Sequence, residues 1–294
     1  MNTPTPFPAT LRTRDGLALV THSWPLPAGT PARGVALIVH GLGEHVQRYA
    51  PVAAHLNAQA WAVVGYDHRG HGRSPGPRGR IAQHDDFLHD LAVAVDAARA
   101  TFPGLPLLLV GHSLGGAIAG RFVAAQAQPP ETASSAPWAR PVDALLLSSP
   151  ALAVDMSPVQ QALLATVGAL LPDVAVANGL KPEWVCHNPA TVAAYVADPL
   201  VHDRVSGRLT RFILDAGETV RARARGWSTP TLILWGGDDR CVAPRGSEAF
   251  LAAAPKGVVS GQPFPALSHE IFLEVEQATV LRVVSDWLGL VFGR

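Results

Sequence analysis

The stretch Leu105-Pro-Leu-Leu-Leu-Val-Gly-His-Ser-Leu-Gly-Gly116 decides the fold of this 294-residue chain. Its apolar run, Leu107 to Val110, is too short for a helix and lies between a proline and a glycine, as expected of a buried strand. The small residues at 116–120 continue into a helical segment. A strand that turns into a helix within so few residues lifts the turn residue, Ser113, clear of the carboxyl edge of a sheet. The stretch therefore predicts an α/β fold with an exposed serine nucleophile.

A second match to the pattern Gly-x-Ser-x-Gly lies at Gly72-Arg-Ser-Pro-Gly76. No strand-like run comes directly before it, and the prolines at positions 75 and 77 prevent a helix from beginning there. The residues around Ser74 are therefore predicted to form a loop, and Ser113 is the candidate nucleophile.

Charge and cysteine content narrow the class of protein. The 23 basic and 23 acidic residues balance, so the net charge indicates no nucleic-acid partner. Cys186 and Cys241 are too few for a disulfide framework and suit a reducing compartment. The first residues resemble no signal peptide, and the best apolar stretch, 162–171, is too short to span a membrane. We therefore expect a cytoplasmic protein, peripheral to membranes at most.

Strand-like and helix-like segments alternate along most of the chain. Strands are expected at 17–24, 35–40, 61–66, 107–110, 142–147, 231–235 and 258–264, and helices at 48–60, 84–101, 114–127 and 277–290. Short apolar strands between helices indicate a mostly parallel sheet with helices on both faces. Residues 150–228 interrupt this order with a helical segment rich in proline and alanine. This segment is predicted to be a cap inserted into a core of residues 1–149 and 229–294.

An acid and a base that act with Ser113 should follow later strands at the same edge of the sheet. Asp238 and Asp239 directly follow the expected strand 231–235, and position alone does not choose between them. Asp143 begins a strand and therefore belongs at the opposite edge. His269 lies in the loop after the last strand, and the chain order of serine, acid and histidine fits a catalytic triad.

The oxygen that becomes negative when a serine attacks a carbonyl needs two N–H donors. The Leu114 amide, at the start of the helix after Ser113, is one candidate. The Leu42 amide is the other, because Gly41 and Gly43 on either side of it permit a close backbone approach, although the same glycines also fit a plain tight turn. The polar loop 67–74 is expected to brace this oxyanion loop.

Taken together, these motifs resemble the monoacylglycerol lipase and lysophospholipase group of α/β-hydrolases. The likeness covers about residues 10 to 290 and includes the cap stretch 188–200. The matching motifs are His-Gly-Leu-Gly-Glu-His at 40–45 with Arg48-Tyr49, Asp-His-Arg-Gly-His-Gly at 67–72, Gly-His-Ser-Leu-Gly-Gly at 111–116, Gly-Gly-Asp-Asp at 236–239, and His269-Glu270.

The resemblance implies an α/β-hydrolase fold and a serine esterase that needs neither a metal nor a cofactor. It assigns the nucleophile to Ser113, the base to His269 and the acid to Asp239, the last residue of the Gly-Gly-Asp-Asp motif at 236–239. The oxyanion donors that it implies are the amides of Leu42 and Leu114. The implied substrate is a small ester or lipid, a monoacylglycerol or a lysophospholipid.

Two other functions stay open at this point. A serine aminopeptidase on the same scaffold needs a carboxylate in the cap to bind the ammonium group of its substrate, and Glu183, Asp215 and Glu218 are candidates. A non-catalytic receptor with a hydrolase fold typically lacks a member of the triad, whereas this chain keeps all three.

The predicted cap contains apolar residues at helical spacing, at Val159, Leu163, Leu164, Val167, Leu170 and Leu171. This stripe either packs on the core or forms the wall of an acyl tunnel whose outer face contacts lipid. The two alternatives are compatible with each other, and the second predicts transient contact with a membrane surface.

Overall fold

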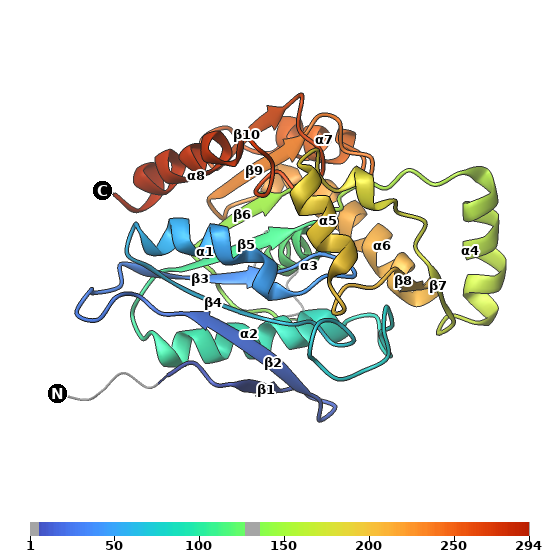
Figure 1. Cartoon of the computed structure of the whole chain (residues 1–294), viewed down its shortest axis with the longest axis horizontal. Coiled ribbons are helices and arrows are strands. Elements are labelled where there is room, and N and C mark those ends of the chain that lie inside the picture. The colour runs from blue at the N-terminus through green and yellow to red at the C-terminus, as the bar shows by residue number, and fades with distance from the viewer. Residues whose placement is uncertain (1–5, 127–135, 294) are drawn as a thin grey trace.

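The centre of the molecule is a single large sheet. The computed structural model describes residues 6–126 and 136–293 (Figure 1). The strands are β1 (Thr10–Arg12), β2 (Ala18–Trp24), β3 (Gly34–Val39), β4 (Trp61–Tyr66), β5 (Leu107–His112), β6 (Ala144–Ser148), β9 (Thr231–Gly236) and β10 (Val259–Phe264). Their order in the sheet is β1-β2-β4-β3-β5-β6-β9-β10. Only β2 pairs antiparallel to its neighbours β1 and β4, and the other pairs are parallel, which confirms the predicted α/β architecture.

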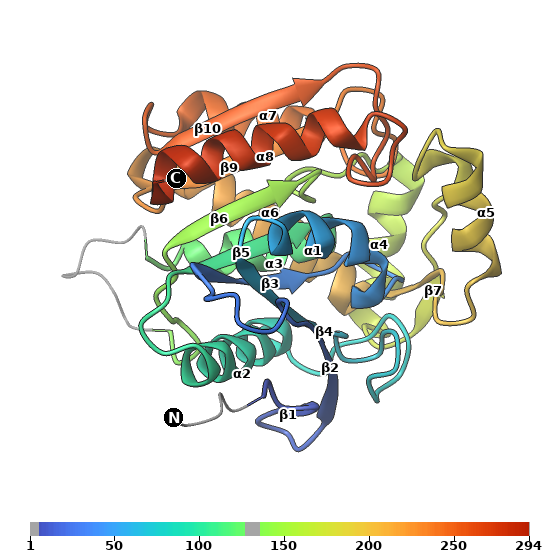
Figure 2. The same ribbon diagram turned by 60° about the vertical axis from the view of Figure 1, so that its left-hand side comes forward.

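Helices cover both faces of this sheet. One face packs against α1 (Ala50–Asn57) and α8 (Gln277–Phe292), which lie in front of the sheet in Figure 2. The other face packs against α2 (Asp86–Thr101), α3 (Leu114–Val123), α6 (Gly207–Arg223) and α7 (Arg245–Ala253).

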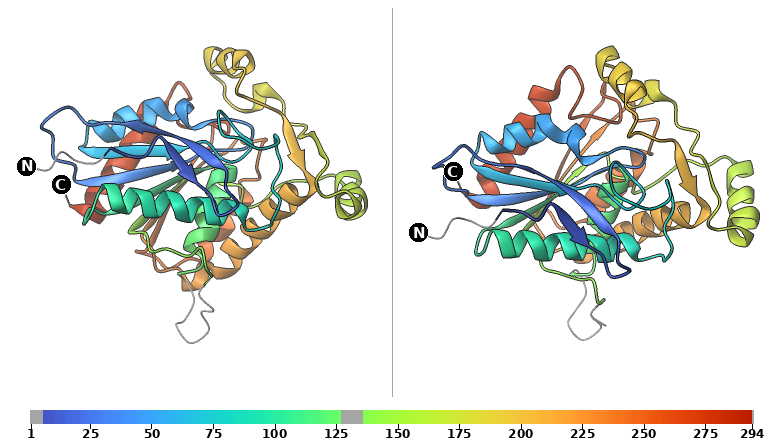
Figure 3. Two further views of the ribbon diagram at one scale, coloured as in Figure 1. Left: turned by 90° about the horizontal axis from the view of Figure 1, so that it is seen from below. Right: turned by 60° about the horizontal axis from the view of Figure 1, so that its bottom comes forward.

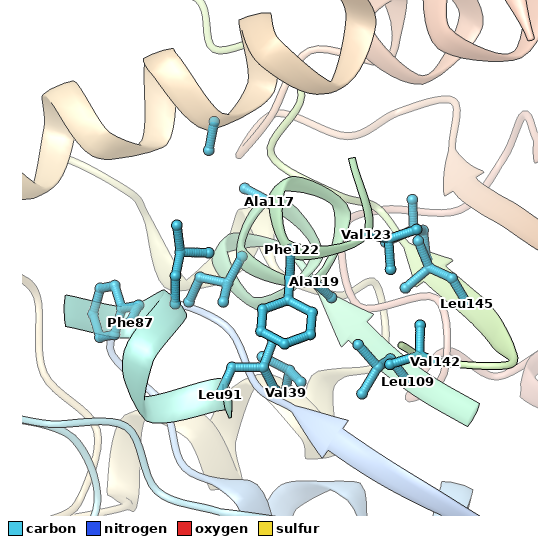
Figure 4. Close-up of a cluster of buried hydrophobic side chains, with 14 of the residues drawn as sticks. Val39, Phe87, Leu91, Leu109, Ala117, Ala119, Phe122, Val123, Val142 and Leu145 are labelled. Carbon is cyan, nitrogen blue, oxygen red and sulfur yellow. The ribbon is translucent and has the colours of Figure 1, made fainter. Parts of the chain in front are cut away.

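Alternate residues of the central strands point into the two apolar clusters. Leu109 of β5 belongs to the cluster around α3, and its neighbours Leu108 and Val110 belong to the cluster under α1 and α8. Figure 4 shows Phe122 of α3 pointing toward Val39 of β3. Since both faces are buried, these strands are apolar along their whole length, which is why their sequences could be recognised.

Several element boundaries differ from the predictions. The expected helix at 48–60 begins as a 3-10 turn, Val46–Tyr49, and becomes α-helical only from Ala50 to Asn57. The helix after Ser113 ends at Val123, and residue 127 of the predicted range lies outside the described residues. The segment 150–228, predicted to be helical, also contains two short paired strands, Ala175–Ala177 and Arg204–Ser206. In the core, two elements, β1 and α7, were not predicted. The first has three residues, and the second buries a single large side chain, Phe250.

The segment between β6 and β9 contains α4 (Pro158–Leu170), β7 (Ala175–Ala177), α5 (Pro189–Ala197), β8 (Arg204–Ser206) and α6. In Figure 1 the arrows of β3 and β5 point toward α4 and α5, so these helices lie beyond the carboxyl edge of the sheet. The helix α6 differs from them, because Phe212 and Val220 lie in the core cluster and Val220 packs on Gly120 of α3. The predicted cap span of 150–228 therefore includes a helix, α6, that packs on the core, and we propose that the part beyond the sheet is about residues 152–206.

The end of the cap is attached to two loops of the core. Strand β8 pairs with β7 in the cap, and just beside this hairpin the His202 N–H donates to the Gly43 carbonyl (2.8 Å). The Ser206 N–H donates to the Gly79 carbonyl (2.8 Å). These bonds fix the last part of the cap directly over the carboxyl edge of the sheet.

The apolar stripe of α4 does not pack on the core. Val159, Leu163 and Leu170 are exposed by 76%, 52% and 82%, and Leu171 is exposed too. Only Leu164 is half-buried, and the side chain of Val167 lies outside the described residues. In both views of Figure 3, α4 stands at the margin of the molecule. Within the described ranges, no helix is long and apolar enough to cross a membrane.

The glycines that flank Ser113 permit two different close contacts. A Cβ atom on Gly115 would lie 1.9 Å from the carbonyl oxygen of Val39, so α3 can rest on β3 only through a glycine. A Cβ atom on Gly111 would lie 2.7 Å from the carbonyl oxygen of Gly115. Gly111 is therefore crowded by Gly115 across the turn, whereas Gly115 is crowded by the neighbouring strand.

Two glycine substitutions in helices should have opposite effects on stability. Gly115→Ala should lower the free energy of unfolding by about 3 kcal/mol or more, because its methyl group overlaps the backbone of β3. Gly289→Ala, in α8, meets no atom within 4 Å and should raise the free energy of unfolding by up to about 1 kcal/mol. Denaturant melts of the two variants measure both changes, and equal effects would contradict this packing of α3.

Candidate active site

Ser113 occupies the turn between β5 and α3 with a backbone conformation that non-glycine residues rarely adopt, φ 54° and ψ −120°. Three main-chain hydrogen bonds hold it there. Its N–H donates to the Ser148 carbonyl (3.1 Å), and its carbonyl accepts from the N–H groups of Ala117 (3.0 Å) and Ala151 (2.9 Å). The half-buried side chain therefore projects from a turn that is bonded to both β6 and α3.

The serine of the second motif is placed differently. Ser74 is buried, and its hydroxyl donates to the Asp67 carbonyl (2.6 Å). The Ser74 hydroxyl oxygen also accepts a hydrogen bond from the Val20 N–H (2.8 Å). Ser74 thus closes a loop, as its sequence context predicted.

The predicted oxyanion loop lies against Ser113. A Cβ atom on Gly41 would lie 3.2 Å from the Ser113 Cβ, so the Gly41–Leu42 backbone borders the candidate nucleophile. The Leu114 N–H is at the first position of α3, where helix N–H groups have no acceptor within the helix. The structure therefore brings both predicted donor segments to Ser113.

The loop 67–74 braces the oxyanion loop, as predicted. The N–H of His68 donates to Nε2 of His40 (2.9 Å), and Nε2 of His68 lies 3.0 Å from the His40 carbonyl. One carboxylate oxygen of Asp67 accepts from the Val46 N–H (2.9 Å). The two loops are joined by three hydrogen bonds, all of them buried.

His269 and Asp239 form a direct hydrogen bond, with 2.7 Å between Nδ1 and Oδ2. The other carboxylate oxygen of Asp239 accepts from the N–H groups of Cys241 (2.8 Å) and Val242 (3.0 Å), which fixes the orientation of the acid. The ring of His269 lies 4.6 Å, between centroids, from the ring of His112, the residue before Ser113. With Nδ1 bonded to the carboxylate, the neutral imidazole holds its proton there and leaves Nε2 free as a base.

Burial and charge act on this pair in opposite directions. Burial disfavours the imidazolium form of His269, but the charge and the hydrogen bond of Asp239 raise its pKa above the ordinary value. Burial likewise disfavours the Asp239 carboxylate, and His269 together with two backbone N–H groups lowers its pKa. Burial and the neighbouring His269 lower the pKa of His112 to about 3, so His112 stays neutral.

The other candidate acids, Asp238 and Asp143, have different partners. Asp238 is half-buried and lies 3.4 Å from Arg240 and 3.5 Å from His187. Asp143 accepts a hydrogen bond from the Leu107 N–H (2.7 Å) at the amino end of β5. Chain position left Asp238 and Asp239 as alternatives, and the hydrogen bond to His269 favours Asp239 as the acid.

Asp239, Cys241 and His269 also form a group whose ligand atoms lie within 4.8 Å of one another, among the residues that the structure describes. The donor set fits a metal poorly. Burial raises the pKa of the Cys241 thiol, and the neutral thiol is a weak ligand. Nδ1 of His269 and Oδ2 of Asp239 already bond to each other, so an ion would have to break that hydrogen bond.

Comparison with known proteins finds similar hydrolases. A model of the family described as serine aminopeptidase, S33, matches residues 30–276. A monoacylglycerol lipase of Mycolicibacterium smegmatis is 34% identical over 276 residues, which is 93% of each chain. The phospholipase YtpA of Bacillus subtilis is 28% identical over 88% of this chain and 96% of that protein. The crystal structure of a monoacylglycerol lipase of Paleococcus ferrophilus superposes with a TM-score of 0.79 and 30% identity, over 93% of this chain and 99% of that one.

The contact between His269 and Asp239 predicts different effects for the two adjacent acids. Asp239→Asn should lower the pKa of the His269 imidazole, because the charge that stabilises the imidazolium is removed. Asp238→Asn is the matched control and should leave that pKa unchanged. Histidine resonances followed by NMR through a pH titration measure both values. A shift in the Asp238 variant alone would move the acid to the neighbouring position.

Proposed function

This chain belongs to the serine aminopeptidase S33 family of α/β-hydrolases and is a carboxylic ester hydrolase, and we propose that it hydrolyses monoacylglycerols with Ser113, His269 and Asp239 as its catalytic triad. The observation that carries this assignment is the 2.7 Å hydrogen bond from His269 to Asp239, beside the strained Ser113 turn. The substrate class comes from the relatives, two of which are named monoacylglycerol lipases.

In the proposed reaction Nε2 of His269 accepts the proton of Ser113, and the serine oxygen attacks the ester carbonyl. The N–H groups of Leu42 and Leu114 bind the resulting oxyanion, and each such donor is typically worth about 10²–10³ in rate. His269 then protonates the leaving glycerol oxygen and activates a water molecule that hydrolyses the acyl-enzyme. Throughout, Asp239 holds the imidazole tautomer and stabilises the imidazolium.

Aminopeptidase activity is less well supported by the charges around the site. The candidate carboxylates Glu183 and Glu218 are exposed, and Asp215 is exposed and 3.3 Å from His84. Exposed carboxylates bind an ammonium group weakly because water screens the charge. Hydrolysis of lysophospholipids is the second candidate, because one relative is a phospholipase. Both activities are measured in the same substrate panel.

We further propose that the cap contacts a lipid surface during turnover. Exposed large apolar side chains gather in the cap, at Val159, Leu163, Leu170, Leu171, Val174, Val176 and Val196. Many exposed apolar side chains in one segment favour contact with lipid or protein, and the substrate of a monoacylglycerol lipase is carried in lipid. The two buried, unpaired cysteines fit a cytoplasmic enzyme that binds a membrane peripherally.

The triad assignment predicts a graded series of losses. Ser113→Ala should lower kcat by roughly 10⁴-fold or more and abolish labelling by a fluorophosphonate, since the members of a triad act as a unit. Asp239→Asn should lose roughly 10³- to 10⁴-fold, because the wrong imidazole nitrogen becomes protonated.

Asp238→Asn and Ser74→Ala are the controls for this series. The first should keep most of its activity on monoacylglycerols, and the second should still be labelled at Ser113. Mass spectrometry locates the label, and a label on Ser74 of the unmodified protein would contradict the assignment of the nucleophile.

The lipid-surface proposal predicts that charge on the outer face of α4 weakens binding to membranes. Leu163→Asp and Leu170→Asp should each lower the affinity for phosphatidylcholine vesicles by roughly tenfold or more, as expected when a leucine no longer enters an apolar phase. Hydrolysis of a soluble acetate ester should not change. Leu290→Asp, at a leucine in α8 that is about as exposed as Leu170, is the matched control. Equal effects at all three positions would mean that the cap is not the contact surface.

A further inference from the structure

A buried ion network joins the predicted oxyanion loop to the 3-10 turn Val46–Tyr49. One carboxylate oxygen of Glu44 accepts hydrogen bonds from the Gly41 N–H and from the Tyr49 hydroxyl, both at 2.6 Å. The other accepts from the Arg48 guanidinium at 2.7 Å. Burial alone would raise the pKa of Glu44, but these donors lower it, so its carboxylate is charged. Glu44 thus holds the backbone one residue before the proposed oxyanion donor Leu42.

The same arginine contacts the loop of the proposed base. Two nitrogens of Arg48 donate to the two carboxylate oxygens of Glu270, one of them at 2.8 Å. Glu270 directly follows His269 in the chain, and its own N–H donates to the Val185 carbonyl (2.7 Å). The Tyr195 ring of α5 lies 4.9 Å from the guanidinium carbon. Glu44, Arg48 and Glu270 therefore form one continuous bridge between two loops of the site.

The bridge is almost dry. The side chains of Glu44, Arg48 and Glu270 are exposed by 5–10% only. The cavity that they line beside His112 has a volume of about 10 Å³, the space of one water molecule. Charges in such surroundings keep a strict geometry, but a buried ion pair adds little net stability, because removing the groups from water costs about as much as their attraction returns. The effect of the bridge is therefore expected in geometry more than in stability.

We propose that the Glu44–Arg48–Glu270 bridge is a positioning device, which keeps the Leu42 amide and the His269 imidazole at a fixed separation around Ser113. This inference rests on the proposed function, since it assumes that these groups act in one reaction. None of the three bridge residues touches the reacting atoms in this assignment. Each acts through the backbone or the neighbouring residue that it holds.

The test removes the central arginine. Arg48→Met keeps most of the side-chain volume but breaks both ion pairs, and Arg48→Lys keeps the charge but cannot make the paired contact with Glu270. Arg99→Met is the matched control. Arg99 also links separate segments, through the Leu105 carbonyl and the Asp143 carboxylate, but it does so at the amino edge of the sheet.

The rate per competent site distinguishes a positioning role of Arg48 from a role in folding alone. Active-site titration with a fluorophosphonate counts the competent sites, and kcat for a soluble ester is expressed per counted site. Arg48→Met should lower this kcat roughly 10- to 100-fold, as expected when reacting groups are misplaced by about 1 Å. KM should change less than about threefold, and Arg48→Lys should recover part of the rate. Arg99→Met should keep the rate of the unmodified protein per site.

Two results would overturn the proposal. One is an Arg48→Met variant with fewer competent sites but an unchanged kcat per site, which is the mark of a purely structural role. The other is an equal loss in Arg99→Met. The rate of fluorophosphonate labelling at Ser113 keeps this test separate from the proposed function, because labelling needs the nucleophile, the base and the oxyanion donors but no ester substrate. An unmodified protein that is not labelled at all would instead refute the assignment of the site.

Discussion

The backbone of Ser113 has to be held in a conformation that costs about 1–3 kcal/mol in isolation, and the site depends on the contacts that hold it. Hydrogen bonds to Ser148 and Ala151 join the turn to the end of β6 and to the residue that precedes the cap. The close approach of α3 to β3 at Gly115 prevents the turn from relaxing. As a result, the serine oxygen and the first N–H of α3 are placed before any substrate arrives, and little reorganisation is needed during the reaction.

The core of the fold could be predicted from the sequence because parallel strands leave a strong pattern. The strands Trp61–Tyr66 and Leu107–His112 are buried on both faces, and their sequences are therefore mostly apolar. Strand β1 leaves no comparable signal, since only Leu11 of its three residues is buried. The apolar stripe of α4 was recognised correctly as one helix face, but periodicity does not tell what covers that face, and the structure leaves it exposed. The place where the cap ends depends on the packing of α6 on α3, which is a tertiary contact.

Some residues of the candidate site could likewise be predicted from the sequence, and others could not. Ser113 and His269 could be predicted because each follows a recognisable strand at the same edge of the sheet. Asp238 and Asp239 share that position, so the resemblance to a known family had to choose between them, and the hydrogen bond to His269 agrees with its choice. The pairing of Arg48 with Glu270 joins residues 222 positions apart, and no local pattern in the chain indicates such a contact.

The attachment of α4 to α6 has a consequence for the divergence of this chain. The two helices cross where Gly207 meets Gly168, and the Arg211 guanidinium donates to the main-chain carbonyl of Leu164 (2.8 Å). Beyond the end of α4, the Arg208 N–H donates to the carbonyl of Pro172 (2.9 Å). These contacts use backbone atoms and small residues of the cap, and none of them uses a side chain on its outward face. Substitutions on that face can therefore accumulate without loosening the helix, so descendants of this chain can acquire a different outer surface while their chemistry is inherited intact.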